Sequence, residues 1–259
     1  MKLKIYQIDA FATKSFEGNP AAVCPLDSWI EDDLMQKIAQ ENNLSETVFF
    51  VKEKNIYHIR WFTPNFEIDL CGHATIASAY VLFEILNIHE DIITFSSKSG
   101  LIKVSKDNDL YTLDFPRMDI QKTDLAEKFI KAFNIRPKEI YKSKSYLFVF
   151  EKEEDIILLK PDFTVLKHLD LRGIIVTAKS HKYDFVTRFF DPNCSIQEDP
   201  VTGSAFTQLV PYWTKILNKS SFKAKQLSQR GGEVMCELKG DRVFISGYAV
   251  KYLEGKIYV

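Results

Sequence analysis

Apolar and polar residues alternate with a period of two along much of this chain, which is the pattern of strands with one buried face. In the first half, this alternation or a composition rich in β-branched and aromatic residues predicts strands at residues 3–10, 21–24, 46–51, 57–62, 92–95, 101–104 and 110–115. In the second half, it predicts strands at residues 145–150, 173–178, 184–190, 234–238, 243–246 and 248–253. We therefore expect several strands in each half.

Four segments have the spacing of helices instead: residues 31–40, 74–86, 123–133 and 205–217. Residues 74–86 are apolar nearly all round and contain neither glycine nor proline, which predicts a helix buried on every side. Residues 205–217 are mostly apolar too, and Pro211 within them is expected to kink the helix or weaken one turn. Each half thus combines several strands with one buried helix.

An internal repeat links the two halves. The segment R-W-F-T-P-N-F-E-I begins at residue 60, and R-F-F-D-P-N-C-S-I begins at residue 188, which is 128 residues later. Each copy leads to a small-residue turn, Gly72-His73-Ala74 in the first and Gly203-Ser204-Ala205 in the second, now 131 residues apart. The second copy therefore carries three extra residues between the two blocks.

The repeat predicts two similar domains around a pseudo-twofold axis. Pro116 follows a strand and cannot donate to a sheet ladder, so we place the boundary there. The domains are residues 1–115, with about 248–259 as a candidate last strand, and residues 116–247. The expected fold class is α+β, with each sheet curled into a barrel around its own central apolar helix. A groove between two such domains is a natural place for a binding site.

Composition excludes several classes of function. Apolar residues make up 46% and charged residues 27% of the 259, as in ordinary globular proteins. A net charge of −1 provides no field that would attract nucleic acid or an anionic membrane. No secretory signal, membrane-length apolar run, nucleotide-binding glycine motif or zinc-type spacing occurs, so we expect a cytoplasmic protein with free thiols and no metal site.

The two helix starts are the first candidates for chemistry. Unpaired N–H groups and about half a positive charge at a helix N-terminus can bind a carboxylate or stabilise a developing enolate. Gly72 and Gly203 would allow close approach of the backbone to a ligand. The alternative is that glycine and serine merely begin these helices, as they do in many proteins.

Four side chains near these positions are suited to proton transfer. Glu46 opens an apolar strand, where a partly desolvated carboxylate suits a general acid or base; without further context, a solvated glutamate at a strand end is the simpler interpretation. His73 at a helix start should be favoured in its neutral form, and Asp199 should stay ionised. Cys71 aligns with Asp199 at the repeat offset, so a thiol faces a carboxylate in the alignment; a free cysteine is more often a small buried apolar residue.

Six motifs spread over the chain resemble those of the phenazine-biosynthesis PhzF-like proteins, which share the diaminopimelate epimerase fold with proline racemases. The motifs are Asp9-Ala10-Phe11, Gly18-Asn19-Pro20-Ala21-Ala22-Val23, Asn43-Leu44-Ser45-Glu46-Thr47-Val48-Phe49, Arg60-Trp61-Phe62-Thr63-Pro64, Asp69-Leu70-Cys71-Gly72-His73-Ala74-Thr75 and Glu198-Asp199-Pro200-Val201-Thr202-Gly203-Ser204-Ala205. The resemblance implies two domains with an active site in the cleft, a homodimer and no cofactor.

The resemblance also implies roles for residues. In PhzF-like isomerases the glutamate of the Ser-Glu-Thr motif, here Glu46, moves a proton on the substrate, and His73 and Asp199 match positions that line the site. The expected catalytic residues are therefore Glu46, His73 and Asp199. The expected substrate-binding residues are Asp69, Cys71, Gly72, Gly203 and Ser204. Asp69 is the weaker candidate, since it would also suit the shaping of a turn.

Three hypotheses follow. The first is a cofactor-independent isomerase acting on a small carboxylate-bearing molecule, similar to trans-2,3-dihydro-3-hydroxyanthranilate isomerase. The second is an amino-acid racemase or epimerase that uses Cys71 and Asp199 as opposed bases; the enzymes of this fold that do so use two thiols, and here the second thiol is missing. The third is a relative that binds a metabolite or a protein without catalysis.

Overall fold

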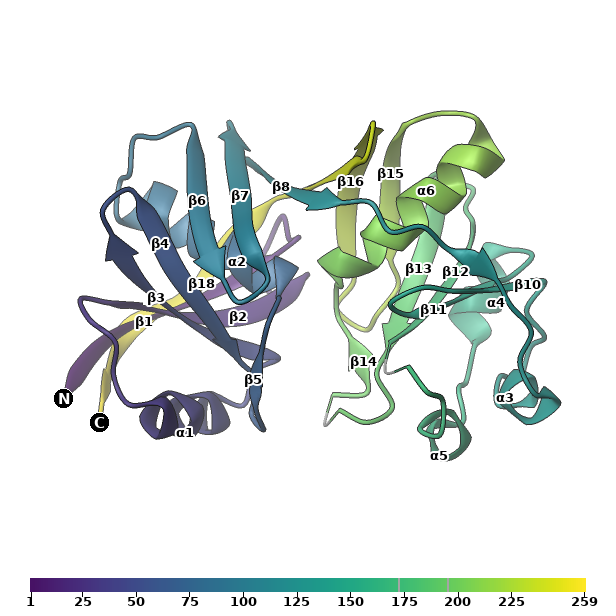
Figure 1. Ribbon diagram of the computed structural model, residues 1–259, viewed down its shortest axis with the longest axis horizontal. Coiled ribbons are helices and arrows are strands. Elements are labelled where there is room, and N and C mark those ends of the chain that lie inside the picture. Colours follow the sequence, from purple (N-terminus) through teal and green to yellow (C-terminus); the bar gives the residue numbers. More distant parts are fainter. Residues whose placement is uncertain (172, 195) are drawn as a thin grey trace. The chain divides into compact units, whose positions relative to one another are not determined.

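The computed structural model describes residues 1–171, 173–194 and 196–259; Ser195, which belongs to the second copy of the repeat, lies outside the described residues. The chain forms two compact units (Figure 1). Unit 1 comprises Met1–Asp114 and Ser246–Val259, and unit 2 comprises Phe115–Ile245. Strands outnumber helices in both, so the expected α+β class is confirmed. None of the helices in the described ranges has both the length and the apolar character needed to cross a membrane.

Unit 1 is a sheet wrapped around one helix. Its strands are β1 (Lys2–Ala10), β2 (Asn19–Leu26), β3 (Glu46–Glu53), β4 (Ile56–Phe62), β5 (Glu67–Ile68), β6 (Ile92–Ser97), β7 (Gly100–Asp107), β8 (Leu110–Pro116) and β18 (Ala249–Tyr258). Its helices are α1 (Asp32–Asn42), α2 (Gly72–Tyr80) and the π-helical turn η1 (Val81–Ile85). Strand β1 lies between β18 and β2, antiparallel to both, whereas β2 pairs with β3, and β4 with β6, in parallel.

Helix α2 forms the centre of this unit. Residues 72–79 are all buried, and the helix packs against β1, β2, β3, β7 and β18. Alternate residues of β6, β7 and β8 are buried, as expected for strands with one covered face. Strands β2 and β3 are buried on both faces because α1 covers their other side with Met35, Ile38 and Ala39. Helix α2, which is apolar on all sides, is therefore surrounded by other parts of the protein on all sides.

Unit 2 is built on the same plan. Its strands are β9 (Gln121–Lys122), β10 (Glu139–Lys142), β11 (Tyr146–Val149), β12 (Ile174–Lys179), β13 (Phe185–Phe190), β14 (Glu198–Asp199), β15 (Ser221–Gln226), β16 (Gly232–Lys239) and β17 (Arg242–Gly247), the last of which crosses back to unit 1. Its helices are α3 (Glu127–Lys131), α4 (Glu153–Leu158), α5 (Phe163–Leu166), the 3₁₀ turn η2 (Gly203–Ala205) and α6 (Phe206–Leu217). Strand β11 is parallel to β12, and β13 is parallel to β15.

Helix α6 contains Pro211 and continues past it. Proline lacks the N–H that would bind the carbonyl four residues earlier, here that of Thr207. The N–H of Met118, from the segment that follows β8, donates to the Thr207 carbonyl at 2.9 Å instead. The indole of Trp213 stacks on Phe185 with ring centroids 5.3 Å apart and anchors the helix against the sheet. A bond from a distant segment thus compensates for the interrupted helical ladder.

Several element boundaries differ from the sequence expectation. The helix predicted at 123–133 is confined to α3, and the helix predicted at 74–86 divides into α2 and η1. Helices α4 and α5 were not predicted, nor were strands β5, β9, β10, β14 and β15. Strand β15 does alternate, but one of its buried positions is a polar residue, Gln226, and its exposed positions are mostly lysines, so its apolar signal is weak.

Candidate active site

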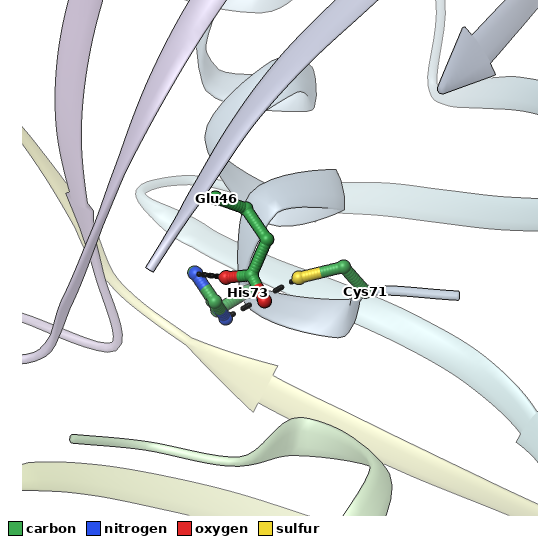
Figure 2. A group of neighbouring side chains, drawn as sticks. All are labelled: Glu46, Cys71 and His73. Carbon is green, nitrogen blue, oxygen red and sulfur yellow. Dashed lines mark hydrogen bonds and ion pairs between the residues drawn. The ribbon is translucent and has the colours of Figure 1, made fainter. Parts of the chain in front are cut away.

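Three of the expected site residues lie together in unit 1. Glu46 is the first residue of β3, Cys71 immediately precedes α2, and His73 is in its first turn. Figure 2 shows the carboxylate of Glu46 and the sulfur of Cys71 both directed at the imidazole of His73. Glu46 Oε2 lies 3.0 Å from His73 Nε2, and Cys71 Sγ lies 3.4 Å from His73 Nδ1. The side chains of His73 and Glu46 are only 5% and 14% exposed.

A fourth residue, Asn19, completes the cluster. It is the first residue of β2, is fully buried, and places its amide nitrogen Nδ2 3.1 Å from His73 Nδ1. Strand β2 runs parallel to β3, with Ala21 opposite Glu46, so the starts of the two strands lie at the same edge. Asn19 was not among the residues predicted for the site, although it belongs to the Gly18-Asn19-Pro20 motif that contributed to the resemblance.

The turn before β2 fixes this asparagine. Gly18 has a φ of +65°, and a Cβ at that position would lie 2.1 Å from the carbonyl oxygen of Ala10. Pro20 restricts the residue before it to extended conformations. The backbone of Asn19 therefore has little freedom, and its amide is held against the imidazole.

Burial and charge act in opposite directions on the cluster. Burial raises the pKa of the Cys71 thiol to about 11, so this thiol is uncharged near neutral pH. Burial lowers the pKa of His73, but its contacts with Cys71 and Glu46 raise it well above its ordinary value. The Cys71 part of that increase requires a thiolate, which is absent near neutral pH, so there only the Glu46 carboxylate opposes the effect of burial. Near neutral pH, burial and the start of α2 therefore both favour a neutral imidazole, and the Glu46 carboxylate acts against them.

The same three side chains offer potential metal ligands. One atom each of Glu46, Cys71 and His73 lies within 4.8 Å of the others. However, the imidazole presents Nε2 to the carboxylate and Nδ1 to the thiol. A single ion would bind only one of the two nitrogens, because a metal coordinates histidine through either Nδ1 or Nε2.

An arginine fixes the segment that leads to α2. Arg60 on β4 donates from Nε and Nη2 to the two carboxylate oxygens of Glu67 on β5, at 2.8 and 2.9 Å. This bidentate pair holds β5 to β4 just before the turn that presents Cys71 and His73. Gly72 is buried at the helix start, and Asp69 is exposed in the turn between β5 and α2.

Unit 2 contains the remaining expected residues. Asp199 ends β14, and Gly203 and the exposed Ser204 form the 3₁₀ turn that precedes α6. The hydroxyl of Thr202 donates to Asp199 Oδ2 at 2.5 Å. Gln226, fully buried, accepts from the Thr202 N–H at 2.9 Å and donates to the Asp199 carbonyl at 2.8 Å. The loop from Asp199 to the helix is therefore held in shape by a glutamine that the sequence did not single out.

The arginine pair recurs in unit 2. Arg188 on β13 donates from Nε and Nη2 to the two carboxylate oxygens of Glu198 on β14, at 2.7 and 2.9 Å. The partners are ten residues apart here and seven apart in Arg60 and Glu67, which accounts for the three extra residues of the second repeat. Glu198, which opens the Glu198-Asp199-Pro200 part of the last motif, is thus bound by this arginine.

Comparisons with known proteins agree over the whole chain. The model of one family, described as phenazine biosynthesis-like protein (PhzC-PhzF), matches residues 8–255. A Pseudomonas aeruginosa protein named as an uncharacterized isomerase is 46% identical over 259 residues, covering 100% of both chains. The crystal structure of a PhzF-family protein from Enterococcus faecalis has a TM-score of 0.97 at 46% identity and covers 100% of both chains. A hydroxyproline epimerase from Agrobacterium vitis shares the fold, with a TM-score of 0.67 at 11% identity over 99% of this chain and 92% of its own.

Proposed function

Since this chain belongs to the PhzC-PhzF family of phenazine biosynthesis-like proteins and is an isomerase of that family, we propose that it moves a proton between two positions of a small carboxylate-bearing substrate. The resemblance drawn from the sequence motifs is thereby confirmed at the level of the family. The observation that carries the proposed chemistry is the 3.0 Å contact between Glu46 Oε2 and His73 Nε2, in surroundings that exclude most water.

The reaction that we propose needs only a proton and a double bond to move. The Glu46 carboxylate takes a proton from a carbon of the substrate, the electron pair of that C–H bond shifts the double bond, and the proton returns to a second carbon. Atoms and electrons balance within the substrate, so the step consumes no oxidant, reductant or cofactor. A positioned carboxylate of this kind contributes roughly 10²–10⁴ in rate.

The remaining site residues are assigned roles by the resemblance. The N–H groups at the start of α2, beginning at Gly72, are suited to bind the substrate carboxylate. We propose Asp199, Gly203 and Ser204 as further substrate-binding or catalytic residues, and trans-2,3-dihydro-3-hydroxyanthranilate as the first substrate to test. We also propose, from the resemblance alone, that the protein is a cytoplasmic homodimer.

The thiol is not part of the proposed proton transfer. A cysteine acts as a base only when it is ionised, and the buried Cys71 has its pKa raised to about 11. The racemase hypothesis, in which Cys71 and Asp199 are opposed bases, requires a reactive thiolate at that position. Cys71→Ser should therefore keep the activity if Glu46 moves the proton, and should lose it if the thiol does.

Glu46→Gln tests the proposal directly. It keeps the size of the side chain and removes the base, so turnover of the dihydroanthranilate or of other small carboxylates in deuterated water should fall by roughly 10²–10⁴, with loss of deuterium from the product. Glu53→Gln is the matched control: Glu53 ends the same strand and also contacts a histidine, His58, at 3.3 Å, but it is 58% exposed. Full turnover by Glu46→Gln would remove Glu46 from its role.

A further inference from the structure

The imidazole of His73 is held from both sides by groups of opposite hydrogen-bonding character. Asn19 Nδ2 lies 3.1 Å from Nδ1, and Glu46 Oε2 lies 3.0 Å from Nε2. Cys71, at 3.4 Å from Nδ1, is the third group at the ring, and its thiol keeps its proton near neutral pH. These contacts come from β2, β3 and the residue before α2, so three separate elements define the ring's surroundings.

The chemistry of these groups fixes where the ring proton lies. An amide nitrogen only donates, so Nδ1 beside Asn19 must be the accepting, unprotonated nitrogen. A neutral imidazole then carries its proton on Nε2, the nitrogen that lies 3.0 Å from the Glu46 carboxylate. Protonation of Nδ1 would set its N–H against the N–H of Asn19, so a further proton that enters the pair is directed to the Glu46 carboxylate.

We infer that Asn19 is a positioning residue that fixes the Nε2–H tautomer of His73 and so makes Glu46, not His73, the carrier of the transferred proton. The inference rests on the proposed function for its catalytic meaning, but the tautomer itself is independent of any substrate. Without the amide donor, Nδ1 is free to hold a proton; the ring then becomes either a cation or the opposite tautomer, in which Nε2 and the carboxylate would both be acceptors. In either case Glu46 no longer lies beside a neutral imidazole protonated at Nε2, the arrangement in which the carboxylate is the group that takes and returns the proton.

The fold supports a fixed amide. Asn19 is fully buried and its backbone is held between the turn at Gly18 and the restriction imposed by Pro20. Its strand pairs on one side with β1, where Asn19 lies opposite Ala10, and on the other side with β3. Because the amide is held in this way, it keeps its N–H directed at Nδ1, and the imidazole takes the tautomer that accepts this hydrogen bond.

The tautomer can be measured without knowing the substrate. In the full-length protein labelled with ¹⁵N-histidine, long-range ¹H–¹⁵N NMR near pH 7 separates protonated from unprotonated ring nitrogens. His73→Gln identifies the His73 signals among the five histidines. We expect an unprotonated Nδ1 and a protonated Nε2 in the wild type. A wild-type Nδ1 that carries the proton would overturn the inference, whether or not any variant folds.

Two variants then separate positioning from stability. Asn19→Asp keeps the shape but replaces the donor by an acceptor, so Nδ1 should become protonated, and kcat should fall by roughly 10²–10⁴ with little change in KM. Asn42→Asp is the matched control: Asn42 Nδ2 donates to Thr47 Oγ1 at 3.0 Å, next to Glu46 but away from the ring. This control should leave the His73 signals and kcat unchanged.

The outcomes distinguish this inference from the proposed function. If Asn19→Asp leaves the His73 signals as they are in the wild type, the positioning role is wrong even if Glu46 is the base. If Nδ1 becomes protonated in Asn19→Asp while Glu46→Gln keeps full turnover, Asn19 fixes the tautomer but the proposed function is wrong.

Discussion

Replacing Arg188 by leucine should destabilise unit 2, because its guanidinium joins three segments of chain. Besides its two bonds to Glu198, Arg188 donates from Nη1 to the carbonyl oxygens of Ile156 and Leu159, at 3.0 and 3.1 Å. It therefore connects β13, the short strand β14 and the end of α4. Its side chain is 14% exposed, and that of Glu198 is 28% exposed.

The expected loss can be estimated from these contacts. Ile156 and Leu159 are buried, so each carbonyl left without its donor costs about 1 kcal/mol, the lower end of the range for a buried unsatisfied group. Glu198 can turn toward solvent when it is released, so the ion pair contributes only about 1 kcal/mol. The total of about 3 kcal/mol corresponds to a thermal midpoint roughly 6–12 °C lower.

Thermal or urea unfolding followed by circular dichroism measures this change. Arg136→Leu is the matched control in the same unit, since Arg136 also makes a two-bond contact with a glutamate, Glu127, but the two side chains are 67% and 48% exposed. Arg136→Leu should unfold within error of the wild type, because solvent screens an exposed pair. If Arg188→Leu loses no more stability than Arg136→Leu, the positioning of β14 by the arginine is refuted.

Two further predictions concern pH and the turn before Asn19. Burial raises the pKa of Cys24 to about 12 and that of Cys71 to about 11, against 9.0 for an ordinary thiol, so above about pH 9 the unfolded chain ionises first and the free energy of unfolding falls. Each thiol lowers the free energy of unfolding by up to about 1.4 kcal/mol per pH unit. Urea unfolding at about pH 8 and about pH 10.5 measures this decrease, and Cys24→Ala should make it smaller. A free energy of unfolding that stays constant between these two pH values would contradict the argument. Gly18→Ala should lower the free energy of unfolding by more than about 2 kcal/mol, because its Cβ would meet the Ala10 carbonyl. Gly240→Ala, at a similar φ of +61° but with no atom within 4 Å of the added Cβ, should lower it clearly less. Equal losses of stability in urea unfolding would show that φ strain alone explains both.

The class of fold and the family follow from local and repeated patterns in the sequence. Period-two alternation identified the strands that have one covered face, such as β6, β7 and β8, because the side chains of a strand alternate between its two sides. The all-round apolar segment that became α2 identified a helix with no exposed face. Six motifs, above all those around His73 and Asp199, identified the family, and the family resemblance predicted the residues proposed for the site.

The contacts that give these residues their chemistry depend on the tertiary structure. Nothing local in the sequence indicates that Asn19 meets a histidine 54 residues away, because this contact depends on how β2 aligns with β3 and on where α2 packs against both. The same is true of the Met118 N–H that satisfies the Thr207 carbonyl released by Pro211. The local pattern of apolar and polar residues shows which face of a helix or strand is buried. Strand register and helix packing determine which polar groups from distant segments lie in contact. The sequence therefore determined the sheets, the buried helices and the family, whereas only the folded chain decided on which nitrogen of His73 the proton is held.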